Sequence, residues 1–142
     1  MKDPSILSLP ARFQSVAYRA SRIPGVSNAA DLSLGANCQL YAYQLLASMG
    51  YQLPDFRSSE LWEDEIFTFR VRDDFQPLDL MLYHRKSEAY GAHVGLYWGE
   101  GQVLHLSKAN GTPKLEAHEA LIQQEKYACF VGAKRLKAIS SR

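Results

Sequence analysis

Cys38 is the residue of this sequence whose type and position best suit covalent chemistry. A free cysteine has a pKa near about 8.5, so an enzyme that uses a cysteine nucleophile has to stabilise the thiolate. Cys38 begins a predicted helix, where unsatisfied backbone amides and the positive end of the helix dipole favour an anion. The same amides can bind the oxyanion that forms during acyl transfer. This position predicts a nucleophilic cysteine.

The helix that begins at Cys38 is predicted over residues 38–49. Asn37 suits the N-cap, because its side-chain oxygen can accept a first-turn amide, and Gly50 suits the left-handed position after the helix. Spacings of three and four indicate a helical face. The apolar residues on that face are Tyr41, Ala42, Leu45, Leu46 and Met49.

A nucleophilic cysteine needs a base, and histidine is the usual partner. Two strand-like runs, 92–98 and 102–106, are joined by Gly-Glu-Gly, which predicts a hairpin. His93 lies on the first run and His105 on the second. The hairpin therefore makes these two residues potential cross-strand neighbours. All histidines of the chain are distant from the cysteine in sequence: His84, His93, His105 and His118.

The hairpin predicts a Cys-His-His triad if both of its histidines point to one face. His105 would accept the spare ring N–H of His93, fix its tautomer and turn its other ring nitrogen toward Cys38. A register shift of one residue would leave the orienting role to Asn110 or to a backbone carbonyl. His84 has the pattern of a solvated loop residue, and His118 that of an exposed helix residue.

The remaining elements are predicted from periodicity. Apolar residues at helical spacing predict a helix over 10–21, an acidic stretch predicts another over 58–65, and a short helix is expected over 116–125. Alternating and apolar runs predict strands over 78–83 and 127–136. Because helices come first and an antiparallel sheet follows, the fold class is α+β.

Length and composition narrow the class of protein. The chain has 142 residues, 46% of them hydrophobic and 22% charged, with a formal net charge of +1. These values indicate a single folded domain over 1–142. The small net charge produces no overall electrostatic field that would attract the protein to a nucleic acid or an anionic membrane. Two cysteines are too few for a disulfide framework, and Cys129 is predicted to be a buried small hydrophobe.

Targeting signals are not evident in the sequence. The apolar run after Met1 is too short for a Sec signal, and no apolar stretch reaches the length of a membrane span. We therefore expect a location in the cytoplasm or export by a route other than Sec. Cys-x-x-Cys pairs are absent, and no metal site is predicted.

Three segments, taken in order, resemble the NlpC/P60 family of papain-like cysteine peptidases. Residues 37–54 resemble its nucleophile helix, which ends in Gly and Leu-Pro. Residues 77–83 resemble its GDLVFF strand, and residues 93–107 resemble its HVGIYxGxGxxIHAS segment. The resemblance covers a motif-bearing core over about residues 35–110, preceded by an N-terminal extension or helix over residues 1–30.

The resemblance implies a fold, a triad and a reaction. The fold would be a papain-like α+β domain in which the nucleophile helix packs on a central antiparallel sheet. Cys38 would be the nucleophile, His93 the general base and His105 its orienting partner, with no metal or cofactor. The implied reaction is hydrolysis of amide bonds in peptidoglycan-type peptides through a thioester acyl-enzyme.

The residues next to the cysteine depart from the family pattern. The family usually has Asp-Cys-Ser-Gly, whereas this chain has Asn37 before the cysteine and Gln39 after it. Many members use the carboxylate and the hydroxyl around the free amine of the substrate, and an asparagine supplies no compensating charge for that amine. Substrate choice is therefore open. The candidate substrate-binding residues are Asn37, Gln39, Tyr83 and Trp98.

Two further functions are compatible with these motifs. An acyltransferase could use the same thioester and pass the acyl group to an alcohol or an amine. A non-catalytic binding module, such as a component of a phage tail or a toxin, could retain the fold without the chemistry. The expected partner of an enzyme is a cell-wall peptide or another amide. A delivery machine or a larger particle is a possible second partner.

Overall fold

The computed structural model describes residues 4–140. The strands are β1 Thr68–Val71, β2 Leu80–His84, β3 His93–Gly99, β4 Gln102–Leu106, β5 Pro113–Ala117 and β6 Cys129–Leu136. The α-helices are α1 Pro4–Leu7, α2 Cys38–Ser48, α3 Ser58–Glu63, α4 His118–Leu121 and α5 Lys137–Ser140. Short 3-10 turns occupy Ala11–Phe13, Leu32–Leu34 and Glu125–Tyr127. The first three residues, which include the start of the predicted N-terminal extension, lie outside the described residues.

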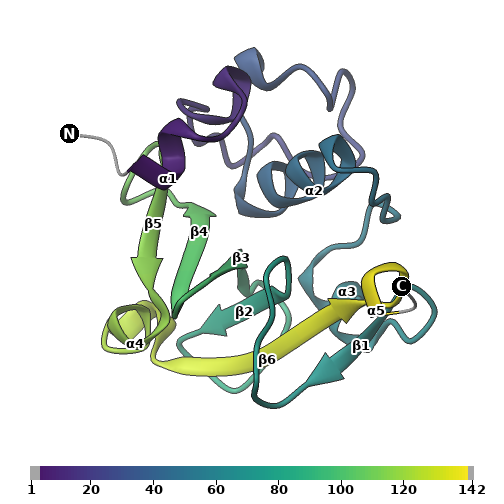
Figure 1. Cartoon of the computed structure of the whole chain (residues 1–142), viewed down its shortest axis with the longest axis vertical. Coiled ribbons are helices and arrows are strands. Elements are labelled where there is room, and N and C mark those ends of the chain that lie inside the picture. The colour runs from purple at the N-terminus through teal and green to yellow at the C-terminus, as the bar shows by residue number, and fades with distance from the viewer. Residues whose placement is uncertain (1–3, 141–142) are drawn as a thin grey trace.

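One six-stranded antiparallel sheet organises the domain, in the order β1-β6-β2-β3-β4-β5. The last strand of the chain, β6, lies between the first two. Figure 1 shows the sheet bending from β5 and β4, through β3 and β2, to β6 and β1, with α2 on its concave side. The α+β prediction is confirmed.

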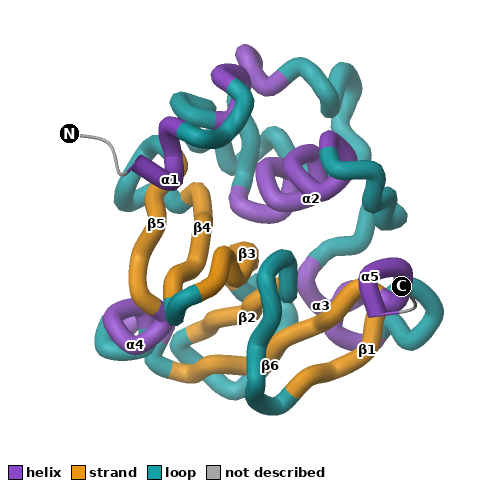
Figure 2. Tube along the Cα trace, viewed as in Figure 1, coloured by secondary structure: helices purple, strands orange, loops and turns teal. Residues whose placement is uncertain are grey.

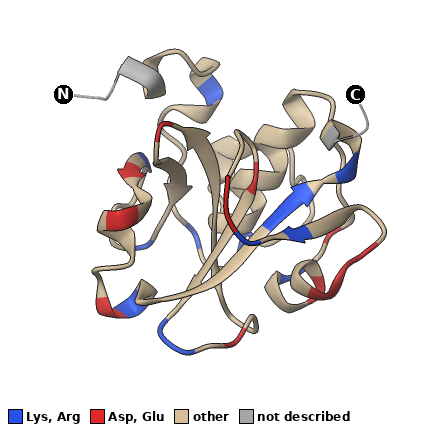
Figure 3. Cartoon of the chain, turned by 60° about the horizontal axis from the view of Figure 1, so that its bottom comes forward, with Lys and Arg blue, Asp and Glu red and all other residues tan. Residues whose placement is uncertain are grey.

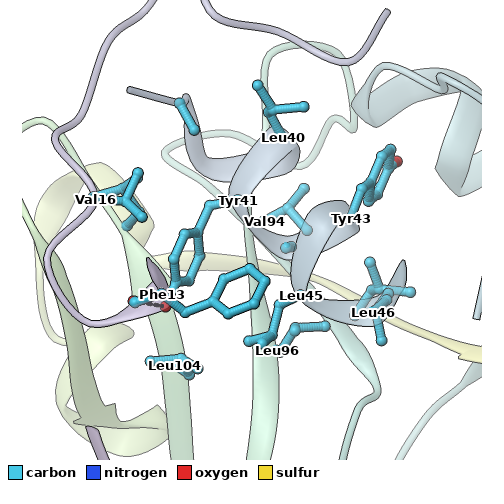
Figure 4. Packing of buried hydrophobic residues seen from close by; sticks show 14 of the residues in the cluster. Phe13, Val16, Leu40, Tyr41, Tyr43, Leu45, Leu46, Val94, Leu96 and Leu104 are labelled. Carbon is cyan, nitrogen blue, oxygen red and sulfur yellow. Dashed lines mark hydrogen bonds between the residues drawn. The ribbon is translucent and has the colours of Figure 1, made fainter. Parts of the chain in front are cut away.

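Helix α2 packs on β3 and β4 and forms the main core. Its residues from Gln39 to Tyr43 are all buried, as are Leu45 and Leu46, so the helix is covered on most of its circumference. Figure 4 shows its side chains against the apolar sheet residues Val94, Leu96 and Leu104. Each fully buried leucine contributes about 1.5–3 kcal/mol relative to exposure. This packing holds the start of α2 in place.

A second apolar cluster covers the other face of the sheet. All residues of β2 from Leu80 to Tyr83 are buried, so this strand has no solvent-facing side. The alternation predicted there therefore separates two cores rather than core from solvent. The second cluster comprises Met81, Tyr83, Val103, Leu121, Tyr127 and Ala133.

The helix predicted over residues 10–21 does not form beyond the 3-10 turn Ala11–Phe13. Phe13 and Val16 are buried, as the pattern suggested, but the backbone that follows is extended. The N–H of Ala36 donates to the carbonyl of Ala17, and the N–H of Tyr18 donates to the carbonyl of Gly111. These long-range partners replace the intrahelical bonds. Figure 2 shows how much of the chain before α2 is loop.

The helix predicted over residues 116–125 is wrong at its start, because β5 extends to Ala117. Lys114 pairs with His105, and Glu116 pairs with Val103 on β4. Helix α4 follows only from His118, and the 3-10 turn Glu125–Tyr127 ends the segment. The carboxylate of Glu116 is thereby brought to the edge of the histidine-bearing hairpin.

Two basic residues of β6 are part of the interior. Lys134 is fully buried and donates to the backbone carbonyls of Trp62 and Asp64. Arg135 holds the buried carboxylate of Asp79 through Nε at 2.9 Å and Nη2 at 2.8 Å. Figure 3 shows the basic stretch of β6 among charges of both signs.

Within residues 4–140, no helix combines the length and the apolarity needed to cross a membrane.

Candidate active site

The predicted nucleophile lies at the first residue of α2. Asn37 is the N-cap, and its Oδ1 accepts the backbone N–H of Leu40 at 2.8 Å. The predicted N-cap and the predicted left-handed Gly50 after the helix, with φ +91°, are both confirmed. Cys38 lines a cleft of about 320 Å³, to which His93 also contributes. The helix start and the hairpin therefore meet at one opening.

Burial and nearby hydrogen bonds have opposite effects on the pKa of the Cys38 thiol. Burial raises the pKa of the Cys38 thiol, because a thiolate is poorly solvated there. Hydrogen bonds from the backbone amides of Val94, Gln39 and Cys38 itself oppose this effect on the pKa, as does the charge of Arg57. Burial is the larger influence, so the resting group is a thiol surrounded by donors that favour the anion.

His93 and His105 are brought together across the hairpin. Leu96 pairs with Leu104, which places His105 opposite Gly95 and makes His93 its diagonal neighbour. The Nε2 of His93 lies 2.8 Å from the Nδ1 of His105. A residue without a side chain at position 95 leaves the two rings room to meet.

The carboxylate of Glu116, which the sequence did not indicate as part of the site, contacts the second histidine, His105. The Nε2 of His105 is 3.1 Å from Oε1 of Glu116, which also accepts from Nδ2 of Asn110 at 2.9 Å. Nε2 of Gln124 donates to the other carboxylate oxygen at 3.4 Å. The hydrogen bond from His105, and after it that from Asn110, lower the pKa of Glu116 to about 2. Asn110 is thus a partner of this carboxylate rather than of His93.

The ionised carboxylate determines the tautomers of both rings. Glu116 can only accept, so the proton of neutral His105 lies on Nε2 and its Nδ1 becomes an acceptor. His93 must then donate from Nε2, which leaves its Nδ1 without a proton. Nδ1 of His93 can therefore accept a proton.

His93 is held neutral by its surroundings. Burial lowers its pKa well below the usual value, and the neighbouring His105 and Lys126 act in the same direction. The ring of Tyr127 stacks on His93, with centroids 4.7 Å apart and planes at 22°. This stacking holds the imidazole plane beside the cleft.

The predicted substrate-binding residues divide into two groups. Asn37 and Gln39 line the cleft, although Gln39 Nε2 is engaged by the carbonyl of Phe56 at 3.1 Å. Tyr83 is fully buried under the other face of the sheet and bonds Nδ1 of His118 at 2.7 Å. Trp98 packs against the main core and does not line the cleft. The structure brings neither aromatic residue to the opening.

Other cleft residues carried no sequence signal that could distinguish them. Tyr18 reaches the cleft from the extended N-terminal segment, Arg57 from the N-cap of α3, Lys108 from the turn after β4 and Tyr127 from the last 3-10 turn. Only the folded chain brings these four segments together. Glu116 did carry a signal, since a Gly-Thr-Pro turn followed by alternating charged and apolar residues is typical of a strand.

The other residues considered for chemistry lie outside the cleft. His118 packs its ring against Phe75 and Phe130, so its predicted exposed position is wrong. His84 is paired with Glu88 at 3.8 Å, and Cys129 is half-buried at the start of β6. Among residues 4–140, no three His, Cys, Asp or Glu side chains are arranged to hold a metal ion.

The sequence matches the model of the NlpC/P60 family over residues 24–131. This match spans more than half of the chain and contains the helix start and both histidines. The chain belongs to the NlpC/P60 family. The predicted resemblance is therefore confirmed, and the matched region extends beyond the 35–110 core in both directions.

Solved structures place this NlpC/P60 domain in the same fold. One is an NlpC/P60 family protein from Bacillus cereus ATCC 10987, with a TM-score of 0.53 and 20% identity, over 71% of this chain and 32% of that one. Another is the NlpC/p60 domain of the peptidoglycan hydrolase SagA, with a TM-score of 0.50 and 17% identity, over 75% of this chain and 81% of that one. The chain thus spans about a third of the Bacillus protein. No curated protein matches the sequence.

Proposed function

We propose that this chain is a cysteine-dependent amidase or endopeptidase that hydrolyses peptidoglycan-type peptides through a thioester acyl-enzyme. The observation that carries the proposal is that Cys38, at the start of a helix, and His93, bonded to His105, line one cleft. Membership of the NlpC/P60 family supports a cell-wall peptidase or amidase. The likeness of the fold to a domain of a peptidoglycan hydrolase is consistent with that class.

The first half of the proposed reaction forms the thioester. Nδ1 of His93 removes the proton from Sγ of Cys38, and the sulfur attacks the carbonyl carbon of the scissile amide. The backbone N–H of Cys38 and the first turn of α2 stabilise the oxyanion. His93 then returns the proton to the leaving amine, and the C–N bond breaks.

The second half releases the acid. His93 removes a proton from water, the resulting hydroxide attacks the thioester carbonyl, and the C–S bond breaks. The thiolate of Cys38 recovers a proton from His93. His105 and Glu116 hold the imidazole in orientation through both steps, with Glu116 stabilising positive charge on the pair of rings.

Digestion of purified peptidoglycan, with product masses, tests this function. Cys38→Ala should reduce release of cleaved peptides to background, whereas Cys129→Ala should keep at least half of the parent rate, because Cys129 lies outside the cleft. Circular dichroism would show that both variants remain folded. An acyl adduct on the parent, seen by intact mass after rapid acid quench, is expected at Cys38. Undiminished hydrolysis by Cys38→Ala would contradict the proposal, and an inert Cys38 would favour the binding module.

A further inference from the structure

The imidazole of His93 lies flat against the ring of Tyr127. The two ring centroids are 4.7 Å apart and the ring planes meet at 22°, which is a stacked arrangement. His105 meets His93 edge to face instead, with centroids 5.0 Å apart and planes at 82°. His93 therefore has a hydrogen-bond partner at the edge of its ring and an aromatic ring across one of its faces.

Tyr127 is held in this position by contacts from several elements. It is 8% exposed and ends the 3-10 turn Glu125–Tyr127. Its hydroxyl is hydrogen-bonded to Ser107, which is buried and directly follows β4. The ring of Tyr83, from the buried strand β2, meets the Tyr127 ring with centroids 6.0 Å apart. Rotation of the Tyr127 ring away from His93 would break these contacts.

The Tyr127 ring acts on its neighbour as an uncharged aromatic group. Burial raises the pKa of the Tyr127 hydroxyl to about 12, so the phenol keeps its proton at neutral pH. The face of a neutral aromatic ring carries partial negative charge and attracts a cation that lies over it. This attraction is larger for an imidazolium than for a neutral imidazole. The stacked ring therefore favours the protonated form of His93.

The charges near His93 have opposing effects on its protonation. Burial has the largest effect and lowers the pKa of His93, and the charges of His105 and Lys126 lower it further. The charge of Glu116 raises the pKa of His93. The titratable and charged groups around His93 are His105 of β4, Glu116 of β5, Lys126 and Tyr127 of the last 3-10 turn, Cys38 of α2, and Tyr18, Arg57 and Lys108 of the cleft lining.

We propose that Tyr127 is a positioning residue that stabilises the imidazolium of His93 through its aromatic face and so favours the ion pair between this imidazolium and the Cys38 thiolate. The proposal rests on the proposed function, in which His93 takes the proton of Cys38. The S–H bond breaks, an N–H bond forms at Nδ1 of His93, and the electron pair stays on the sulfur. The new positive charge then lies on the ring that Tyr127 covers.

Alkylation of Cys38 by iodoacetamide measures this ion pair without any substrate. In a Cys129→Ser background, Cys38 is the only thiol. Between the pKa of His93 and that of Cys38, the population of the ion pair does not change with pH, so the alkylation rate has a plateau. At alkaline pH the rate comes from thiolate beside a neutral imidazole. His93→Ala should abolish the plateau.

Tyr127→Leu should lower the plateau by about three- to tenfold, because it removes the aromatic face beside the imidazolium. It should leave the rate at about pH 10 within about twofold of the parent, because His93 is neutral there. A change in packing or access alone would alter both rates. Tyr127→Phe keeps the ring and should retain the plateau. Phe130→Leu is the matched control, because Phe130 belongs to the same apolar cluster but contacts Tyr83 rather than His93.

Ring-fluorinated phenylalanines in place of Tyr127 test the electrostatic cause directly. Fluorine hardly changes the size of the ring but withdraws negative charge from its face. Phenylalanines with one, two and three ring fluorines should lower the plateau stepwise from the value of Tyr127→Phe. Because these residues preserve the packing, they test the proposal even if Tyr127→Leu does not fold.

The possible outcomes separate this proposal from the proposed function. Equal plateaus across the fluorinated series would overturn the role of Tyr127 while leaving the pairing of Cys38 with His93 intact. A parent whose alkylation shows no plateau and does not respond to His93→Ala would contradict that pairing, and with it both the hydrolase and the role of Tyr127.

Discussion

A partly buried carboxylate determines how the two histidines of the candidate site are hydrogen-bonded and where they carry their protons. Glu116 receives hydrogen bonds from His105, Asn110 and Gln124. Its negative charge determines where the protons lie on two imidazoles in series and leaves a basic nitrogen on His93. The residue thus acts on Cys38 only through the two histidines, which makes it a positioning residue.

Replacing this carboxylate should slow turnover while leaving the cleft unchanged. Glu116→Gln keeps the size of the side chain and removes its charge. We expect kcat to fall by about tenfold to a hundredfold with little change in KM. Because Glu116 raises the pKa of His93, the acid limb of the pH–rate profile should also move to lower pH. Glu119→Gln, at an exposed position of α4, serves as control.

A structural role alone would not shift the acid limb. If Glu116→Gln lowers kcat through instability only, the pH profile will coincide with that of the parent, and the positioning role will be contradicted. Thermal unfolding of the same samples separates the two effects.

The pH dependence of the parent follows from the opposite pKa shifts of its two central residues. His93 has a lowered pKa and must be neutral to accept a proton, so the acid limb of kcat/KM should lie below pH 6.5. Cys38 has a raised pKa, so the thiol form should persist through neutral pH. Rates of hydrolysis and of Cys38 alkylation measured from pH 4 to 10 test this. An acid limb above pH 6.5 would contradict the prediction.

At the scale of elements, the β3–β4 hairpin depends on a residue with no side chain. A Cβ at Gly95 would lie 2.6 Å from Cγ1 of Val103 and 3.1 Å from Cβ of His105. Both distances are too short for an unstrained contact. The close approach of the strands here is what allows the His93 and His105 rings to meet.

Gly95→Ala should therefore harm both stability and activity. Overpacking of this kind costs about 1–3 kcal/mol in free energy of unfolding, and displacement of His105 should lower kcat/KM at least tenfold. Urea unfolding and peptide kinetics at a temperature where the variant is folded measure the two effects.

The double variant Gly95→Ala/Val103→Ala tests the cause. Removing the Val103 methyl groups relieves the shorter contact, so the double variant should be more stable than the sum of the single changes implies. Strict additivity would show that the Val103 contact is not the source of the strain.

At the scale of the whole molecule, a buried ion pair joins the start of β2 to the last strand. Asp79 is 1% exposed, and Arg135 holds both of its oxygens from β6. Asp79 also accepts the backbone N–H of Gln76 at 2.8 Å. Because β6 lies between β1 and β2 in the sheet, this ion pair connects the last strand of the chain to the segment that begins β2.

Breaking the ion pair should lower the free energy of unfolding by a measurable amount. Asp79→Asn is expected to cost about 3 kcal/mol, because it leaves a largely buried guanidinium without its counter-ion. The exposed pair Arg70–Glu63, with side chains 50% and 75% accessible, is the control. Glu63→Gln should change the free energy of unfolding by less than about 0.5 kcal/mol. Equal effects of the two substitutions in urea titrations would contradict the role of Asp79.

The sequence by itself determined the elements whose signals are local. The cap and the helical spacing after Asn37 predicted α2, and the Gly-Glu-Gly connection predicted the β3–β4 hairpin with His93 and His105 on it. Capping, periodicity and tight turns act over a few residues, so they can be recognised without knowing the rest of the fold. The ordered motifs also sufficed for the family.

Only the tertiary structure decided what depends on distant partners. Residues 17–19 are extended because their backbone hydrogen-bonds with Ala36 and Gly111. Residues 113–117 form a strand because they pair with β4. Glu116 reaches His105 because β5 pairs with β4, and Arg57 and Lys108 come to one cleft from separate segments of the chain. A short segment adopts the conformation in which the folded chain supplies partners for its backbone hydrogen bonds. The energy of these bonds and contacts exceeds the weak intrinsic preference of the segment for helix or strand.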